Sequence, residues 1–129
     1  MPTAGERFAR AIAAKDGAAL SVLLADQIDF QAPTPGRHWQ AGTPGQVAED
    51  IILGHWFGAG DDIKELCAVT TGEVAGRDHV AYRLRVARDG RDHLVEQQAY
   101  YNTDGGQITW MRVLCSGYQP LHEGQLAAH

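Results

Sequence analysis

The spacing of hydrophobic residues changes along the chain from a helical period to an alternating one. Near the start, Phe8 and Ile12 lie four positions apart, and Thr3 with Glu6 forms the capping box that begins a helix. A second short helix, rich in leucine, follows Asp16. The second half of the chain alternates in long segments that are separated by turn sequences. This order predicts helices first and a sheet afterwards, which is the α+β class.

One strand lies between the second and third predicted helices. Ile28, Phe30 and Ala32 alternate with polar residues, and Pro33 ends the strand because proline cannot donate a ladder hydrogen bond. We expect the following segment, TPGRHWQAG, to be a loop. Thr43 is a good cap for the third helix, which the sequence predicts to begin there.

The third helix is predicted to place Val47, Ile51 and His55 along one line, because residues four apart share a face of an α-helix. Gly58 is expected to end it. His55 then has two interpretations. It is either a proton carrier that faces a cavity near the helix end or a core histidine with one backbone hydrogen bond.

Four successive strands are predicted in the second half of the chain, separated by turns rich in Asp and Gly. Neither face of the last two strands is cleanly apolar. Gln97, for example, shares a face with Val95, Ala99 and Tyr101. The four segments cover residues 63–76, 79–90, 91–105 and 106–117.

Composition limits the classes of protein that fit this pattern. The 129 residues, 44% of them hydrophobic, fit one domain over residues 1–120, with a flexible tail at 121–129. A net charge of −5 without a Lys or Arg cluster argues against nucleic-acid binding. No apolar run approaches the roughly 20 residues of a membrane helix, and the start MPTAGERFAR lacks the apolar core of a signal peptide. We therefore expect a cytoplasmic protein without membrane contact.

The two cysteines, Cys67 and Cys115, are isolated in the sequence and lack the spacing of a zinc site. We interpret them as buried free thiols. No motif requires a metal, a nucleotide or any other cofactor, and we expect none.

The order of elements, the chain length and the segment GQITWMRV after an Asp-Gly turn resemble the nuclear transport factor 2-like superfamily, and within it the SnoaL-like proteins. The resemblance covers nearly the whole chain. It implies three N-terminal helices packed on a strongly curved antiparallel sheet, a cone with an internal pocket for a small molecule, and a homodimer formed through the outer sheet face. A sheet between a partly polar pocket and a partner subunit explains the mixed faces.

Catalytic residues of this superfamily match only in part. Ketosteroid isomerases keep a general-base Asp before the proline that ends the first strand, where this chain has Ala32. Limonene epoxide hydrolases use an Arg-x-Asp and a later Asp. Here Arg83 is retained in type, but Arg85 and Val113 occupy the carboxylate positions. Polyketide cyclases use a pocket Asp, and the last strand offers Cys115 instead.

The resemblance selects an inner sheet face on which two arginines and Gln97 would suit an anionic or carbonyl-rich ligand. The alternative is a solvated face, with Arg83 or Arg85 paired to Glu96 or Glu73. The opposite face would hold Tyr82, Tyr100, Trp110 and Leu114 as a dimer surface. If a bulge or the turn at ARDGRD exchanges the two faces, these residues would instead pack in the core. The expected ligand-binding residues are Phe30, Ala32, Trp39, Ile51, Arg85, Val95, Gln97, Tyr101, Val113 and Cys115.

The resemblance and these residues predict a protein that binds a small, partly apolar organic molecule. If it is an enzyme, His55 would act as acid or base, and Arg83 with Gln97 would polarise the substrate in a cofactor-free isomerisation, cyclisation or dehydration. A non-catalytic ligand-binding or accessory protein is the alternative. A third possibility is a scaffold that uses only the outer sheet face, with an interior filled by side chains.

Overall fold

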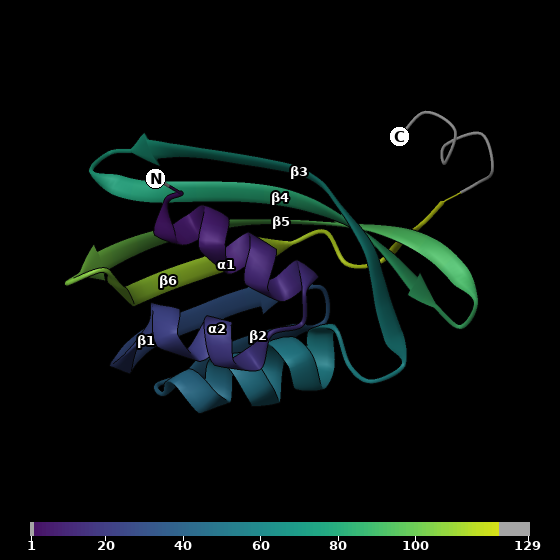
Figure 1. Ribbon diagram of the computed structural model, residues 1–129, viewed down its shortest axis with the longest axis horizontal. Helices are drawn as coiled ribbons and strands as arrows, with labels where there is room; N and C mark the ends of the chain where they lie inside the picture. The colour runs from purple at the N-terminus through teal and green to yellow at the C-terminus, as the bar shows by residue number, and fades with distance from the viewer. Residues whose placement is uncertain (1, 122–129) are drawn as a thin grey trace.

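Three helical segments lie over one face of a curved, seven-stranded sheet in the computed structural model, which describes residues 2–121 (Figure 1). The α+β class predicted from the sequence is confirmed. We call the helix-covered side of the sheet its inner face, the other side its outer face, and the space between helices and sheet the interior. The helical segments are α1 (Ala4–Ala13), α2 (Gly17–Leu23) and η1 (Gln46–Trp56).

The first two helices begin where the sequence predicts. The Thr3 hydroxyl accepts a hydrogen bond from the Glu6 backbone N–H at 3.1 Å, and the Asp16 carboxylate accepts one from the Ala19 N–H at 3.0 Å. Phe8 on α1 is fully buried, and its ring meets the Tyr82 ring edge-on at 6.3 Å. This contact holds α1 on the inner face of the sheet.

The third helical segment, η1, is a π-helix, which corrects the α-helix predicted there. Its last backbone bond runs from the Phe57 N–H to the Ile52 carbonyl at 2.8 Å, five residues back. In this wider helix, nine residues make about two turns, so Val47 and Trp56 are both buried on one side; in an α-helix they would face opposite ways. Gly54 permits the close turns, because a Cβ there would lie 2.6 Å from the Glu49 carbonyl oxygen.

The strands follow the order β2-β1-β6-β5-β4-β3, and β7 pairs with the start of β5. One central pairing, β1 with β6, is parallel, which corrects the fully antiparallel sheet predicted from the sequence. The two edge strands, β2 and β3, leave the sheet open. The bounds are β1 Leu24–Thr34, β2 Arg37–Ala41, β3 Asp61–Val74, β4 Arg77–Arg88, β5 Arg91–Asp104, β6 Gln107–Cys115 and β7 Gln119–Pro120.

Strand β2 occupies the segment predicted as a loop. It folds back on β1 across a tight turn at Pro35 and Gly36, where Gly36 adopts a φ of +81°. The pairing sets Trp39 opposite Ala32. This hairpin brings an aromatic side chain to the end of η1, which the loop prediction did not anticipate.

The face of β4 is opposite to the predicted one. Asp89 and Gly90 both have positive φ and form a two-residue turn, so Arg88 pairs with Arg91 and Tyr82 pairs with Gln97. Residues directly opposite in a sheet share a face. Tyr82 therefore lies on the inner face with Gln97, and Arg83 and Arg85 lie on the outer face. The predicted inner positions of Val95, Gln97 and Val113 agree with their burial.

Replacing Gly5 with alanine is expected to lower the free energy of unfolding by about 1–3 kcal/mol, although alanine is the better helix former. A Cβ at Gly5 would lie 2.7 Å from both the Tyr101 hydroxyl and the Val80 Cβ. Gly45 is the matched control, because no atom lies within 4 Å of the corresponding Cβ. Urea unfolding of both variants measures the effect, and a Gly5→Ala protein as stable as Gly45→Ala would contradict it.

No helix within residues 2–121 combines the length and the apolar character needed to cross a membrane. Of the predicted tail, residues 121–129, the structure describes Leu121, whose backbone N–H donates to the Asp92 carbonyl at 3.0 Å; residues 122–129 lie outside the described residues.

Candidate functional site

A polar pair lies on the inner face of the sheet, among apolar side chains. Gln97 on β5 is only 3% exposed, and Tyr82 opposite it on β4 is 3% exposed. The Tyr82 hydroxyl donates a hydrogen bond to the Gln97 side-chain oxygen at 2.6 Å. Burial raises the pKa of Tyr82 well above its usual value, so the phenol keeps its proton at neutral pH.

Two buried N–H groups have no hydrogen-bond partner among residues 2–121. They are the side-chain amide nitrogen of Gln97 and the indole nitrogen of Trp56. Leaving a buried donor unsatisfied costs about 1–3 kcal/mol, and most buried polar groups in folded proteins are paired. These two donors therefore mark positions where a bound molecule can supply an acceptor.

Trp56 stands at the end of η1, where helix, sheet and hairpin meet. Its ring packs against Phe30 of β1 at 6.1 Å and against Trp39 of β2 at 6.4 Å between ring centres. Its backbone carbonyl accepts a hydrogen bond from the Tyr118 hydroxyl at 2.6 Å. The same residue thus offers a free donor from its side chain and anchors a neighbouring segment through its backbone.

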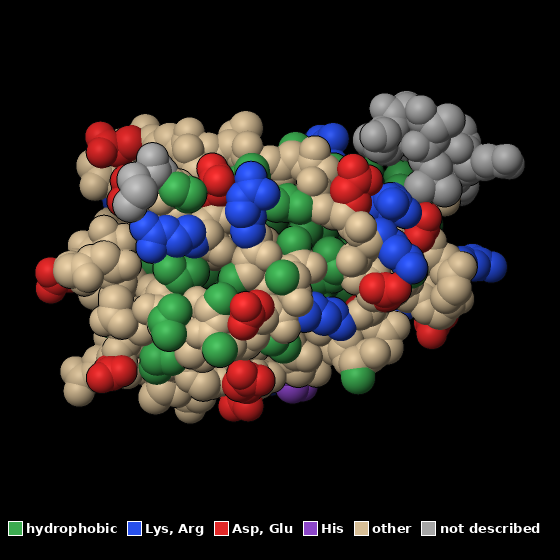
Figure 2. All heavy atoms as spheres, viewed as in Figure 1, with side chains coloured by type: hydrophobic (Ala, Val, Ile, Leu, Met, Phe, Trp, Pro, Cys, Tyr) green, Lys and Arg blue, Asp and Glu red, His purple; other side chains and the backbone are tan. Residues whose placement is uncertain are grey.

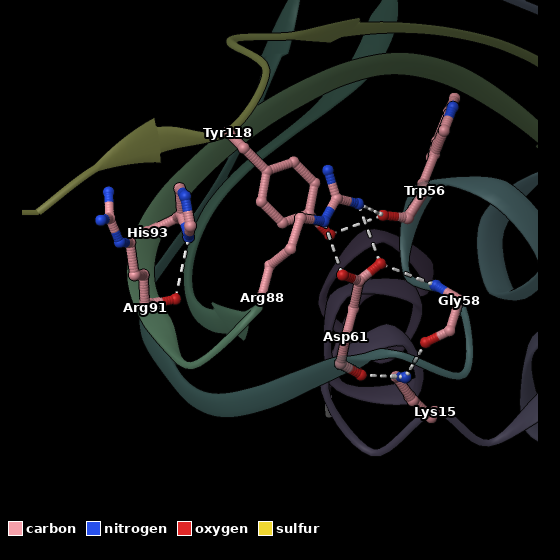
Figure 3. A network of polar contacts seen from close by, with 8 residues as sticks. All are labelled: Lys15, Trp56, Gly58, Asp61, Arg88, Arg91, His93 and Tyr118. Carbon is pink, nitrogen blue, oxygen red and sulfur yellow. Dashed lines mark hydrogen bonds and ion pairs between the residues drawn. The ribbon is translucent and has the colours of Figure 1, made fainter.

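A charged network borders the interior next to Trp56 (Figure 3). Arg88 at the end of β4 donates to both carboxylate oxygens of Asp61, at 2.6 and 2.9 Å. The Gly58 N–H donates to the same carboxylate at 3.0 Å, and the Lys15 ammonium donates to the Gly58 and Asp61 carbonyls. The hydrogen bond from Arg88 lowers the pKa of Asp61, which is only 8% exposed. This ion pair ties the start of β3 to the end of β4.

Residues 116–121 run antiparallel along the start of β5 and form a segment that we call the strap. Its backbone bonds to β5 at both ends, from the Ser116 N–H to the Glu96 carbonyl and from the Leu121 N–H to the Asp92 carbonyl. Between them, the Tyr118 ring lies under the Arg88 guanidinium, 3.5 Å from its centre (Figure 3). Burial raises the pKa of Tyr118. The strap is therefore held against the same network that borders the interior.

One cavity lies on the outer face of the sheet. Its volume is about 530 Å³, and its floor includes the small side chains of Ala68 and Ala81. Arg83 crosses it in an ion pair with Glu96 at 2.7 Å, which is the solvated alternative considered for this arginine. The other residues that line the groove are Thr70, Gln98, Leu114 and Ser116 of the outer face, together with Tyr82, Gln97 and Cys115 of the same strands.

The structure does not bring together the two predicted catalytic residues. His55 is exposed, its Nδ1 lies 2.7 Å from the Asp50 carbonyl oxygen, and its ring packs on Trp39 at 5.0 Å. The reason is the wider turn of η1, which moves His55 off the buried side. Arg83 lies on the outer face, and Arg85 beside it pairs with Asp92 at 3.2 Å. Their roles remain predictions that the geometry does not favour.

The other predicted ligand-binding residues lie on the inner face or beside it. Trp39 and Cys115 are half-buried. For all of these residues, contact with a ligand remains a prediction. Sequence reasoning missed Tyr82, Trp56 and Tyr118; the two-residue Asp89-Gly90 turn was the signal that could have identified Tyr82. Among the predicted ligand-binding residues, those that are buried are Phe30, Ala32, Ile51, Val95, Gln97, Tyr101 and Val113.

On the helix side, hydrophobic side chains are visible in a hollow near the middle of the molecule, with charged side chains around them (Figure 2). Several partly buried hydrophobic residues of β3, including Ile63 and Leu66, pack against the core. Within residues 2–121 there is no group of three or more His, Cys, Asp or Glu side chains placed to hold a metal ion.

Solved structures with the same architecture carry several activities. An epoxide hydrolase of the LEH-like type from M. tuberculosis is 14% identical, with 88% of this chain and 80% of that chain covered and a TM-score of 0.63. A proposed polyketide cyclase from Pseudomonas putida is 14% identical over 99% and 98%, with a TM-score of 0.63. An NTF2-like protein of unknown function from Cytophaga hutchinsonii is 14% identical over 85% and 84%, with a TM-score of 0.51.

No family model matches the sequence, and no curated protein matches it. At identities this low, the structural likeness establishes a shared fold and leaves the chemistry to the residues of this chain.

Proposed function

Because this chain has the nuclear transport factor 2-like fold, we propose that it binds a small, partly apolar organic molecule in its interior, next to Gln97 and Trp56. Apolar residues of the helices and the inner sheet face supply the contact surface. The Gln97 amide donates a hydrogen bond to an oxygen of the ligand.

The unpaired amide of Gln97 carries this proposal. The Tyr82 hydroxyl donates to the side-chain oxygen of Gln97, and the amide nitrogen of Gln97 has no hydrogen-bond partner among residues 2–121. A pair that served only packing would be replaced by apolar groups at little cost. A polar pair kept in the middle of an apolar face, with one donor free, is instead the arrangement that orients a ligand.

An enzymatic role as a cofactor-free isomerase, cyclase or dehydratase is the second candidate function. The Tyr82-to-Gln97 chain favours it, because a donor polarised by a second hydrogen bond stabilises negative charge on a substrate oxygen. Proton transfer also requires a base. Among the described residues, Asp61 is the only buried carboxylate, and Arg88 holds it as an ion pair. Binding is therefore the function that the geometry supports best.

The homodimer through the outer face also remains a proposal. The groove at Arg83 and the exposed Leu114 would lie inside such a contact.

The double variant Tyr82→Phe with Gln97→Met tests the binding proposal. We expect its free energy of unfolding to stay within about 1 kcal/mol of the parent protein, since both partners of one hydrogen bond are removed together. We expect its affinity for neutral bicyclic ketones, with 1-tetralone as the probe, to fall at least tenfold. Urea unfolding and titrations followed by NMR measure the two quantities.

The matched control is Gln98→Met, one position along β5 on the outer face, which is expected to leave the affinity unchanged. An affinity for 1-tetralone that is the same in the double variant and in the parent protein would overturn the proposal. So would a parent protein whose Gln97 and Trp56 side-chain N–H resonances do not shift with any member of a library of neutral bicyclic compounds.

A further inference from the structure

We infer that Cys115 is a reactive thiol that adds to α,β-unsaturated carbonyl compounds, with the Gln97 amide N–H donating to their carbonyl oxygen. This inference rests on the proposed function, in which the same amide meets a ligand oxygen. It adds a covalent step and the chemical class of the compound that takes part in it.

Gln97 and Cys115 are direct neighbours across strands β5 and β6. They are partners in the antiparallel register, and the next residue, Ser116, bonds to the Glu96 backbone through both its N–H and its hydroxyl. Directly opposite residues share a sheet face, and their Cβ atoms lie about 4.5–5.5 Å apart. Both residues also line the cavity of about 530 Å³. A compound bonded to the Cys115 sulfur is therefore within reach of the Gln97 amide.

The amide beside Cys115 has a free donor. The Gln97 side-chain oxygen accepts from the Tyr82 hydroxyl at 2.6 Å, while its amide nitrogen is buried and has no partner within residues 2–121. Cys115 lies close to this pair, because its charge is the second cause, after burial, that raises the pKa of Tyr82. A carbonyl oxygen next to the thiol would give the free N–H the acceptor that it lacks.

The Cys115 sulfur has a defined position at the end of β6. The residue is only half-buried, and its sulfur accepts a hydrogen bond from the Gly117 N–H at 3.3 Å. The chain turns back to make this contact at Gly117, whose φ of +76° is one that glycine adopts without strain. The thiol is therefore neither enclosed in the core nor free to rotate away from Gln97.

Conjugate addition at this position needs no group beyond the protein and water. The thiolate sulfur forms a bond to the β-carbon of the compound, the C=C π bond breaks, and negative charge develops on the carbonyl oxygen. The Gln97 N–H stabilises that enolate oxygen. The proton lost from the thiol is carried by water to the α-carbon. The product is a thioether, and nothing is oxidised or reduced.

The second cysteine, Cys67, is an internal reference for this reaction. It is also half-buried, but it lies on the edge strand β3, with β4 between it and the strand of Gln97. Its thiol donates to the Glu65 carbonyl at 4.0 Å. Burial, together with the charge of Glu65, raises its pKa. The two thiols therefore differ in ionisation as well as in the amide beside them, and the experiment has to separate these effects.

Two electrophiles separate the effect of the amide from access and ionisation. As 2-cyclohexen-1-one reacts, charge builds up on its carbonyl oxygen, whereas methyl methanethiosulfonate transfers a methylthio group to sulfur and has no carbonyl. The ratio of the two rates at one cysteine therefore reports the donor to the carbonyl oxygen. Trypsin cuts after Lys64, Arg77 and Arg112, which places the two cysteines in different peptides. Mass spectrometry then gives both rates at both sites of the full chain.

We expect the ratio of the enone rate to the thiosulfonate rate to be about tenfold higher at Cys115 than at Cys67. The double variant Tyr82→Phe with Gln97→Met removes the donor without leaving the Tyr82 hydroxyl unpaired. It should lower the ratio at Cys115 to about that of Cys67 and leave the thiosulfonate rate nearly unchanged. Urea unfolding checks that the variant folds. If it does not, the comparison of the two cysteines in the parent protein decides.

Equal ratios at the two cysteines of the parent protein would overturn the inference. A double variant in which both rates at Cys115 fall equally would also overturn it, because Gln97 would then act only through packing. Binding of 1-tetralone distinguishes this failure from that of the proposed function, since its carbonyl is conjugated only to an aromatic ring and does not add thiols. If the ratios are equal and 1-tetralone still shifts the Gln97 side-chain resonance, the binding function stands. If neither effect is seen, both are contradicted.

Discussion

Replacing Asp61 with asparagine is expected to lower the free energy of unfolding at neutral pH by about 2–3 kcal/mol. The change replaces the carboxylate with a neutral amide that has a single acceptor oxygen, so Arg88 loses its charged partner and cannot keep both of its hydrogen bonds to this side chain. The effect is below the roughly 3–5 kcal/mol of a fully buried pair, because the Arg88 side chain is 37% exposed. Urea unfolding at pH 7 measures the difference.

The loss of stability in Asp61→Asn is also expected to depend on pH. The pKa of Asp61 is lowered in the folded protein, so its ionised form stabilises the fold fully above the ordinary Asp value of about 3.9. That stability is lost as the pH falls from there through the lowered pKa. The gap between parent and Asp61→Asn should therefore close below about pH 4. Asp62→Asn is the control, since Asp62 pairs only with Lys64 at the surface, and an equal effect of both would contradict the prediction.

Replacing Phe8 with alanine is expected to lower the free energy of unfolding by about 3–5 kcal/mol, the largest effect we predict for a single residue. Phe8 is fully buried between α1 and the sheet, and its ring supports Tyr82. The cavity would also loosen the Tyr82–Gln97 hydrogen bond, so the affinity for 1-tetralone should fall together with the stability. Guanidinium unfolding and the ligand titration measure both.

The conservative variant Phe8→Leu separates the effect of lost side-chain volume on stability from the effect of the lost aromatic contact. It should recover more than half of the lost stability, because it fills most of the cavity. Val22→Ala, at a position 69% exposed, is expected to change the stability little. A loss below about 1 kcal/mol in Phe8→Ala would show that α1 is not held through this residue.

The candidate site was only half predictable from the sequence, and strand β4 shows why. Alternation alone gives two faces for each strand but not which face points inward. For β5, the face with Val95 and Gln97 was predicted to point inward, and both residues are buried. For β4 the arginines resembled a family motif and were placed inside. The two-residue turn at Asp89 and Gly90 sets the register and moves them outside.

The helical segment η1 shows a second limit of sequence patterns. Spacing of four residues fits both an α-helix and part of a π-helix, so Val47 and Ile51 are buried in either case. The two periods separate only farther along, where Trp56 turns inward and His55 outward. Gly54 is the one local signal, since the close approach to the Glu49 carbonyl excludes a side chain.

The strap and the network at Asp61 depend on tertiary contacts that no local pattern encodes. Tyr118 follows a glycine in a stretch without periodicity, and its partners Trp56 and Arg88 are distant in sequence. Capping residues such as Thr3 and Asp16, by contrast, act within four positions and were predicted correctly. Short-range rules therefore located the helices, while the site required the three-dimensional structure.

The parallel pairing of β1 with β6 also determines when the protein can fold during synthesis. Phe30 and Met111 are partners in the sheet, although 81 positions separate them. Until β6 has left the ribosome, β1 has only the short hairpin with β2, and the apolar faces of α1 and α2 have no complete sheet to cover. A closure of this length is slow, and the exposed surface invites association with other chains. Chaperones that bind apolar segments would therefore meet the nascent N-terminal half before β6 is available to pair with β1.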